Sequence, residues 1–481
     1  MGHPYAPCDP LSEAMHRARR LLAWLAAGCV VGAVLAGLGG HVGAAAAPFS
    51  PNVLVTDGLA VYPEHVEPSL AMNAQGTLYL AWKEALTPDG VGQRVAFARS
   101  DDGGTTWSTS ALKALTAPDR LQSDPWLTLD EAGRLHFASL EYTADGTVGG
   151  ITVTRSDDGG RTWSAPANAD DRPGFADKES MASDGNGTLY LAYDDVLGAQ
   201  LDRGDQVDLR ITRSTDGGAT WSPTVPVANS VGNLVGPVLA ALPDGTVHAA
   251  WWNVTDGNVM ADTSRDHGVT WGADVRVNPV PGSAAVVDGS WVGSMPSIAV
   301  DGLGRLYVAW ADRGAGTADV LVARSEDGGA SWASPVRVND DFAGDQWMPS
   351  LSVDGKGVLH MAWMDGRTGA WNVEYANSTD GGGNWGANFR VTTAETPLSF
   401  VRPGDYLGLA TDANGTAYVA WTDGRGGSLE IYFARSTPAS LPEDGSLPWA
   451  LIAVGVLAGA LVAGTVAYIL VRRSRPSGKA P

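Results

Sequence analysis

The chain has 481 residues and a formal net charge of −21, from 53 acidic and 32 basic side chains. Its ends are net basic, +1 over residues 1–47 and +4 over 448–481, so residues 48–447 carry −26. Such an acidic surface repels phosphate backbones and argues against nucleic-acid binding, while 44% apolar residues argue against disorder. The 61 glycines and 18 tryptophans indicate an all-β protein rich in tight turns.

The first 47 residues have the order of a secretory signal. Residues 21–39 are 19 residues without a charge, follow the basic stretch 17–20 and run into the alanines at 44–47. This order predicts a signal peptide over 1–47; the alternative is a retained signal anchor, because 19 apolar residues just span a bilayer. Both cysteines of the chain lie in this segment, so we expect no disulfide in the exported domain.

The other end has the pattern of a membrane anchor. Residues 449–471 are 23 residues without a charge, followed at once by Arg472 and Arg473. That length suffices for a transmembrane helix, and basic residues mark its cytoplasmic flank. We therefore expect a single-pass cell-surface protein with an extracytoplasmic domain, a linker (438–448), a transmembrane helix (449–471) and a cytoplasmic basic tail (472–481).

Between the two ends the sequence repeats itself. A glycine turn followed by a short apolar, β-prone segment recurs at intervals of 57, 54, 58, 59, 53 and 58 residues. Its glycines are Gly76, Gly133, Gly187, Gly245, Gly304, Gly357 and Gly415. Internal periods of this length indicate a modular β architecture with one supersecondary unit per repeat.

A second recurring motif follows each of the first six glycine turns. It has the form S-x-D-x-G-x-T-W, with Ser in place of the Thr in the fifth copy and Asn in the sixth. The Asp suits a turn because it accepts backbone N–H bonds, the Gly permits positive φ, and the Trp covers an apolar strand edge. The residues are Asp102 and Trp107, Asp158 and Trp163, Asp216 and Trp221, Asp266 and Trp271, Asp327 and Trp332, and Asp380 and Trp385.

This S-x-D-x-G-x-T-W motif resembles the Asp-box (BNR) repeat of sialidases and related β-propellers. The resemblance implies that residues 48–437 form a β-propeller in which each box joins the third and fourth strands of a blade, on the face away from the active site. The seven recurring glycine turns predict seven blades. The alternative is six blades, the number usual in sialidases. Residues 52–56 are expected to supply the fourth strand of the last blade and so close the ring.

The face opposite the Asp boxes is expected to point outward and to carry the function. The resemblance implies a glycosidase site there, with arginines for a sugar carboxylate, a tyrosine nucleophile backed by a carboxylate, and an acid/base residue. The acids and aromatics in the loops entering the first strands, with the recurring Asp-Arg pairs, supply the candidates. These are Asp177, Glu179, Arg402 and Tyr406 as catalytic residues, and Arg313, Arg367, Arg425, Trp126 and Trp347 as substrate-binding residues.

Structural interpretations of the same residues stay open. The Asp-Arg pair recurs at one place in three repeats, which favours an ion pair within each blade, and the acids entering the first strands could cap turns or bind Ca²⁺. The sequence lacks an F-R-I-P-like motif near the first repeat, where sialidases place their first catalytic arginine, so no catalytic residue is transferred from that family. Two hypotheses follow: a sialidase-like glycosidase without a cofactor, or a non-catalytic module that binds a protein, a glycan or a cation. In either case the expected partner is a glycan or a glycoprotein.

Overall fold

The fold is seen in a computed structural model. The structure describes residues 48–56, 61–87, 92–111, 115–170, 172, 174–196, 207–284, 295–397 and 406–437. The chain divides into residues 1–47 and 48–481, and all the described residues belong to the second unit. The predicted signal segment, linker and transmembrane helix therefore lie outside the described residues. Within the described ranges there is no helix that is long and apolar enough to cross a membrane.

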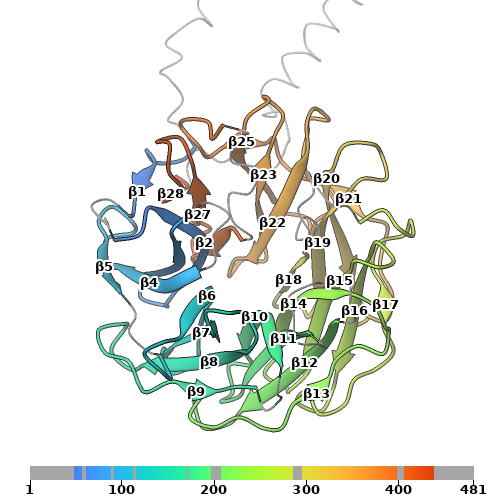
Figure 1. Ribbon diagram of the computed structural model, residues 1–481. Coiled ribbons are helices and arrows are strands. Elements are labelled where there is room, and N and C mark those ends of the chain that lie inside the picture. Colours follow the sequence, from blue (N-terminus) through green and yellow to red (C-terminus); the bar gives the residue numbers. More distant parts are fainter. Residues whose placement is uncertain are drawn as a thin grey trace, which may run out of the picture. The chain divides into compact units, whose positions relative to one another are not determined.

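The described residues form strands, which follow one another in antiparallel meanders (Figure 1). The first two meanders contain β2 (Glu64–Met72), β3 (Leu78–Ala85), β4 (Gly92–Ser100) and β5 (Ser108–Ala111), then β6 (Leu121–Leu129), β7 (Leu135–Tyr142), β8 (Gly149–Ser156) and β9 (Ala167–Asn168). The next two contain β10 (Phe175–Ser183), β11 (Leu189–Val196), β12 (Val207–Ser214) and β13 (Val225–Pro226), then β14 (Leu234–Ala241), β15 (Val247–Asn253), β16 (Asn258–Ser264) and β17 (Val275–Arg276).

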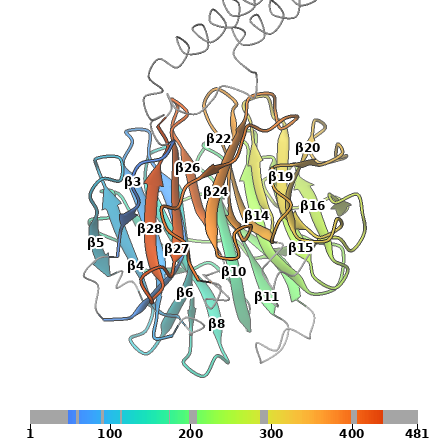
Figure 2. The same ribbon diagram turned by 90° about the horizontal axis from the view of Figure 1, so that it is seen from above.

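The remaining strands continue the same pattern. They are β18 (Ser297–Val300), β19 (Leu306–Asp312), β20 (Asp319–Ser325) and β21 (Val336–Arg337), β22 (Gln346–Val353), β23 (Leu359–Asp365), β24 (Asn372–Ser378) and β25 (Phe389–Arg390), and finally β26 (Gly408–Thr411), β27 (Ala417–Asp423) and β28 (Glu430–Arg435). In the turned view the strands run between two opposite faces (Figure 2). A single parallel pairing, Phe175 with Gly149, joins the second and third meanders into one eight-stranded sheet.

The sheets are arranged in a closed ring. The first strand of each meander contacts the first strand of the next, from β2 through β6, β10, β14, β18 and β22 to β26, and β26 contacts β2 again. The prediction that residues 52–56 supply the fourth strand of the last sheet is confirmed, because β1 (Val53–Leu54) pairs antiparallel with β28. Val55 N–H extends this pairing by donating to the carbonyl of Ile431 at 2.9 Å. The two ends of the described chain are thus joined within one sheet.

The glycine turns and the Asp boxes lie at the same end of the sheets, as the sequence predicts. In the first box, the Ser100 hydroxyl donates to Asp102 at 2.8 Å and accepts the Gly104 N–H at 2.9 Å. The Thr106 hydroxyl and N–H donate to the same carboxylate at 2.7 and 2.9 Å and lower the pKa of Asp102 to about 2. Corresponding hydrogen bonds lower the pKa of the box aspartate to about 2 in three other repeats, at Asp216, Asp266 and Asp327.

Each box also fastens one sheet to the preceding one. The Arg99 side chain of β4 donates to the carbonyl of Gly159 in the next box at 2.8 Å, and equivalent bonds join Arg155 to Gly217, Arg213 to His267 and Arg324 to Gly381. The box tryptophan adds apolar contact across the same joint, since Trp107 lies edge-on to Phe433 of β28 with ring centroids 5.1 Å apart. The boxes are therefore joints between sheets as well as turns within them.

Candidate functional site

Irregularities in the first strands position the candidate site. In β2, β6, β10, β14 and β22 the register shifts near the end opposite the Asp boxes, which marks a β-bulge. One residue in each bulge has a positive φ: Glu67 (62°), Asp124 (50°), Lys178 (52°), Gly236 (64°) and Met348 (54°). Non-glycine residues in this conformation are strained and concentrate at functional sites. Four of the five that the described residues contain lie at these bulges.

The bulges surround a central cavity of about 220 Å³. Residues from all seven first strands, or from just before them, line it, and five prolines supply much of its wall: Pro68, Pro125, Pro237, Pro296 and Pro349. The third meander differs from its neighbours. In the second and fourth meanders the bulge residue is followed by a proline, whereas in the third meander the bulge residue Lys178 is followed by Glu179. Trp126 and Tyr406 also line the cavity and lie edge-on to each other, with centroids 6.4 Å apart.

Three residues from different sheets meet at this cavity. The Lys178 ammonium lies 2.5 Å from Asp124 Oδ1 and 5.3 Å from the centroid of the Tyr406 ring. The Tyr406 hydroxyl donates to the same Asp124 oxygen at 3.2 Å. Asp124 and Lys178 are only 5% and 4% exposed, so their charges interact with little screening by water. We call Asp124, Lys178 and Tyr406 the Asp124 cluster.

Glu179 lies beside this cluster and differs from the other acids. Its side chain is 2% exposed, and neither carboxyl oxygen has a hydrogen-bond partner among the described residues. Burial raises the pKa of Glu179 well above its usual value, and the nearby carboxylates of Asp124 and Asp177 raise it further. The carboxyl group is therefore held protonated over a wider pH range than an ordinary glutamate, which is the state that a proton donor requires.

The structure brings three of the four predicted catalytic residues into this region. Asp177 accepts the backbone N–H of Lys178 at 2.9 Å, Glu179 and Tyr406 line the cavity, and Arg402 lies outside the described residues. One expectation is corrected: Asp177 and Glu179 lie within β10 rather than in a loop before it. The bulge, and not a loop, allows neighbouring side chains of one strand to turn toward the cavity.

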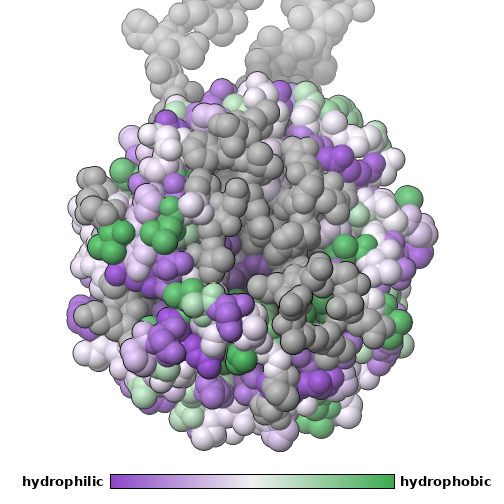
Figure 3. Space-filling view, in the orientation of Figure 1, coloured by the Kyte–Doolittle hydropathy of each residue, from purple (hydrophilic) through white to green (hydrophobic). Residues whose placement is uncertain are grey.

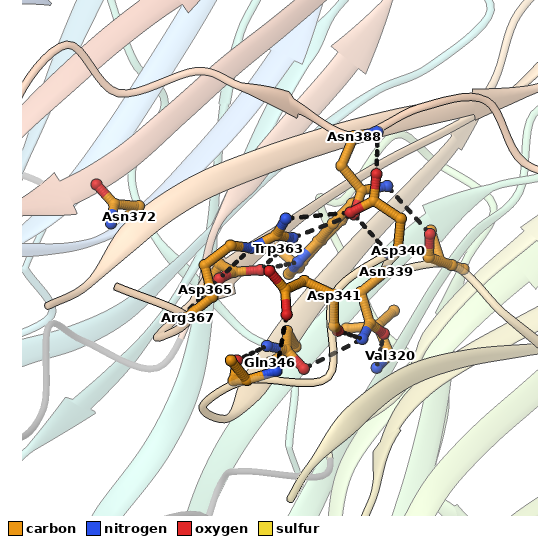
Figure 4. Close-up of polar contacts among 12 residues, drawn as sticks. Val320, Asn339, Asp340, Asp341, Gln346, Trp363, Asp365, Arg367, Asn372 and Asn388 are labelled. Atoms are coloured by element: carbon orange, nitrogen blue, oxygen red, sulfur yellow. Dashed lines mark hydrogen bonds and ion pairs between the residues drawn. The ribbon is translucent and has the colours of Figure 1, made fainter. Parts of the chain in front are cut away.

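The three predicted substrate-binding arginines, Arg313, Arg367 and Arg425, are held by aspartates and do not line the cavity. Arg367 binds both oxygens of Asp365 at 2.8 Å and also contacts Asp340 and Asn388, each at 3.1 Å (Figure 4). Asp365 also accepts the indole N–H of Trp363 at 3.0 Å, two residues earlier on β23. This arrangement ties the end of β23 to the neighbouring loops.

Of the two equivalent arginines, Arg425 also pairs with the aspartate of its own repeat, whereas the ion pair of Arg313 is with an aspartate beside the next sheet. Arg425 contacts Asp423 at 2.5 Å and the side-chain oxygen of Asn52 at 3.1 Å, next to the closing strand β1. Arg313 contacts Asp345, which precedes β22 of the following sheet, at 2.7 Å. Each arginine is therefore neutralised by a different carboxylate, and the three do not converge on one point.

The two predicted substrate-binding tryptophans have different environments. Trp126 is half-buried, donates its indole N–H to the carbonyl of Met181 at 3.0 Å and lines the cavity. Trp347 is 1% exposed and packs in the core with its centroid 5.5 Å from that of Trp371. Only Trp126 therefore presents a ring surface to a ligand in the cavity. Among the described residues, no group of three or more His, Cys, Asp or Glu side chains is arranged to hold a metal ion.

Comparison with known proteins agrees with the repeats in the sequence. Residues 76–292 match the BNR repeat-like domain. This chain carries the Asp-box repeat. The chain is 25% identical over 279 residues, 55% of its own length, to a sialidase of Bacteroides fragilis. It spans 44% of that relative, less than half of its length.

Solved structures resemble the chain in fold. An ulvan lyase bound to a saccharide of glucuronic acid and sulfated rhamnose matches with a TM-score of 0.50 and 14% identity, over 77% of this chain and 94% of the other. A Hadza microbial sialidase matches with a TM-score of 0.44 and 19% identity, over 63% of each chain. At these identities the likeness concerns the fold, and the chemistry must be argued from the cavity itself.

Proposed function

We propose that the meanders are the seven blades of an Asp-box β-propeller, and that this propeller binds a glycan at its central cavity and hydrolyses a terminal glycosidic bond. The observation that carries the proposal is Glu179, a buried carboxyl group with a raised pKa at the wall of the cavity. Its neighbours complete the chemistry, and the name of the Bacteroides relative supports the same class of reaction.

The proposed reaction has two steps. In the first, Glu179 donates its proton to the leaving glycosidic oxygen while the Tyr406 oxygen attacks the anomeric carbon and passes its proton to Asp124. Lys178 stabilises the charge of Asp124 before the transfer, and the ring of Tyr406 is held by both residues. In the second step, ionised Glu179 takes a proton from water, whose oxygen attacks the anomeric carbon and breaks its bond to Tyr406. Asp124 returns its proton to the departing Tyr406 oxygen, so that the tyrosine, the Asp124 carboxylate and protonated Glu179 are all regenerated.

Replacing Tyr406 by phenylalanine tests this assignment. A panel of fluorogenic glycosides, sialosides included, should reveal a substrate for the wild-type chain, and Y406F should lower its turnover at least about 100-fold, because the nucleophile is removed. Tyr432 is the matched control, since it is half-buried but stacks on Trp421 and Arg425 away from the cavity. Full activity in Y406F, with Y432F equally active, would contradict the role of Tyr406.

A non-catalytic module is the second candidate function. It is favoured by the three arginines, each of which is engaged by an aspartate and so does not form the anion-binding group that the sialidase resemblance implies. A chain of this kind would bind glycans at the same cavity without turning over any member of the panel.

We also propose that residues 1–47 direct export and that 449–471 anchor the propeller, with residues 472–481 in the cytoplasm. The support is the charge pattern of the sequence, with 23 uncharged residues before Arg472 and Arg473. Alkaline carbonate extraction of cells should leave the full-length chain in the membrane pellet and release a chain ending at residue 447. Release of both chains in the same fraction would contradict the anchor.

A further inference from the structure

We propose that a second site, in the groove between the third and fourth meanders, binds a small organic acid through the side chains of Arg213 and His267. The groove has a volume of about 170 Å³ and lies at the Asp-box end of the sheets, opposite the bulges. The inference therefore does not depend on the function proposed for the central cavity. It rests on the contacts of the arginine, on a strained histidine and on the apolar residues that complete the groove.

The arginine that precedes a box serine makes two contacts in three of the repeats. In the first repeat, Arg99 Nη1 donates to the carbonyl of Gly159 in the next box at 2.8 Å, while Nε and Nη2 donate to the Asp101 carboxylate at 3.0 and 2.7 Å. The same two contacts recur at Arg155, with Gly217 and Asp157, and at Arg324, with Gly381 and Glu326. The outer edge of the guanidinium group is thus a carboxylate site in these repeats.

The third repeat keeps the arginine and lacks the acid. Arg213 Nη1 donates to the carbonyl of His267 in the next box at 2.7 Å, but Thr215 stands where the other three repeats have Asp or Glu. No carboxylate among the described residues forms an ion pair with Arg213. The adjacent box aspartates, Asp216 and Asp266, accept hydrogen bonds from threonines of their own turns. The Nε–Nη2 edge of Arg213 can therefore bind a carboxylate supplied by a ligand, in the geometry seen in the first repeat.

The groove also contains a strained residue. His267 has a φ of 62° and is the one non-glycine residue with positive φ, among those described, that lies outside the bulges. Its side chain is exposed and lines the groove, and its Nδ1 lies 3.2 Å from the hydroxyl of Tyr190. An imidazole kept in a conformation that favours glycine points to a role for the side chain. The other five boxes have glycine at this position, with φ of 68 to 71°: Gly103, Gly159, Gly217, Gly328 and Gly381.

The groove between the fifth and sixth meanders shows what the same position is like when the arginine is paired. Its volume is about 90 Å³, and its arginine, Arg324, contacts Glu326 at 3.1 Å. The wider groove is thus the one whose arginine has no acid partner among the described residues. In the narrower groove, the places of Tyr190, Arg213 and His267 are taken by Tyr307, Arg324 and Gly381.

The rest of the lining suits the body of a small organic acid. Apolar side chains surround the arginine, and they are Tyr190, Ile211, Pro223, Val225 and Val269. On the face seen in Figure 3, by contrast, the hydrophobic spots of the described surface are scattered (Figure 3). A guanidinium group beside apolar side chains matches a carboxylate joined to a compact apolar body. The size of the groove, about 170 Å³, is below the roughly 300–1,000 Å³ of typical small-molecule sites, so the ligand is small.

Benzoate and benzamide are matched probes for this site, because they share one shape and differ in charge. Titration of the full-length protein, followed by saturation-transfer NMR, measures the Kd of each. We expect benzoate to bind at least about tenfold tighter than benzamide, since only benzoate forms charge-assisted hydrogen bonds with the arginine. The net charge of −26 over residues 48–447 opposes non-specific binding of the anion. Equal binding of the two probes, or binding of neither, would overturn the proposal.

Thr215→Glu places the missing acid beside Arg213. The new carboxylate should occupy the Nε–Nη2 edge, as Glu326 does at Arg324, and weaken benzoate binding at least about tenfold. Thr379→Glu is the matched control. Thr379 is also exposed and has the same position in the sixth box, but Asn377 precedes that box in place of an arginine. Benzoate binding that is unchanged in T215E, or equally weakened in T379E, would contradict the site.

His267→Gly separates binding from folding. The variant acquires the glycine of the other five boxes, so its Tm should equal or exceed that of the wild type. Benzoate binding should nevertheless weaken at least about threefold, because the imidazole wall of the groove and its hydrogen-bonding nitrogen are lost. Weaker binding at an undiminished Tm supports the proposal. Unchanged binding in H267G, or weaker binding that merely follows a lowered Tm, would count against it.

Discussion

Replacing Glu179 by glutamine is expected to lower kcat at least about 100-fold while the fold is kept, because a positioned proton donor contributes about 10² to 10⁴ in rate. Glutamine has the shape of a protonated glutamate and fits a site where the carboxyl group is 2% exposed and lacks hydrogen-bond partners among the described residues. The wild-type rate should fall as the pH rises through the raised pKa of Glu179, since only the protonated form can donate. In E179Q this dependence should disappear.

The stability of the wild type should fall with rising pH in the same direction as its activity. The pKa of Glu179 is higher in the folded protein than its unfolded value of about 4.3, so the folded state holds this proton more tightly. The resulting stabilisation is complete below about pH 4 and is lost as the pH rises through the folded-state pKa. The glutamine in E179Q cannot ionise and contributes no such pH dependence. The free energy of unfolding of E179Q minus that of the wild type should therefore increase as the pH rises.

Glu374 provides the control for both measurements. It is 6% exposed, lies on β24 away from the cavity, and burial raises its pKa to about 7. Glu374→Gln should shift stability with pH in the same sense as E179Q and leave turnover unchanged. Equal loss of activity in the two variants, or undiminished activity in E179Q, would show that Glu179 is not the proton donor.

The fold was largely predictable because its signals are local. The glycine turns and the Asp boxes recur with their own hydrogen bonds, such as those around Asp102, and need no information from other sheets. The closing strand could also be predicted, since residues 52–56 have the pattern of the fourth strands of other repeats. The sheet formed by β1 and β28 confirms that prediction.

The candidate site was predictable only in part. The sequence points to Asp177, Glu179 and Tyr406 through the acids and aromatics of the loops expected to enter the first strands, and the structure places all three in the region of the cavity. Lys178 was missed, although the replacement of the recurring proline by Glu179 marks this repeat as different. The contact of Asp124 with Tyr406 joins residues 282 positions apart, and no local pattern predicts such a pairing.

The arginines and Trp347 show why residue type alone is a weak guide. The recurring Asp-Arg pair fits both an anion site and an ion pair, and the choice depends on which carboxylate lies nearby, as Asp345 does for Arg313. Trp347 was expected on the outward rim, but the strand β22 begins one residue earlier and directs its ring into the core. Period-two alternation along a strand decides between burial and exposure, and a bulge shifts that alternation.

The joint between the first and last sheets should be the point where a single methyl group destabilises the propeller most. Gly104 has a φ of +86°, and a Cβ at this position would lie 1.9 Å from the ring of Phe433 on β28. We expect Gly104→Ala to cost about 3 kcal/mol in the free energy of unfolding, because backbone strain of about 1–2 kcal/mol adds to overpacking of about 1–3 kcal/mol. Denaturant unfolding of the full-length chain, followed by tryptophan fluorescence, measures the difference.

Gly76 separates the two contributions. Its φ of +83° is nearly the same, but a Cβ there would meet no atom within 4 Å. Gly76→Ala should therefore show the backbone strain alone, about 1 kcal/mol, and the excess cost of Gly104→Ala reports the contact with Phe433. If the two variants lose equal stability, the Asp box does not pack against the last sheet as tightly as the structure indicates. A large excess would mean that the closure of the ring depends on this box as well as on the pairing of β1 with β28, since Phe433 takes part in both.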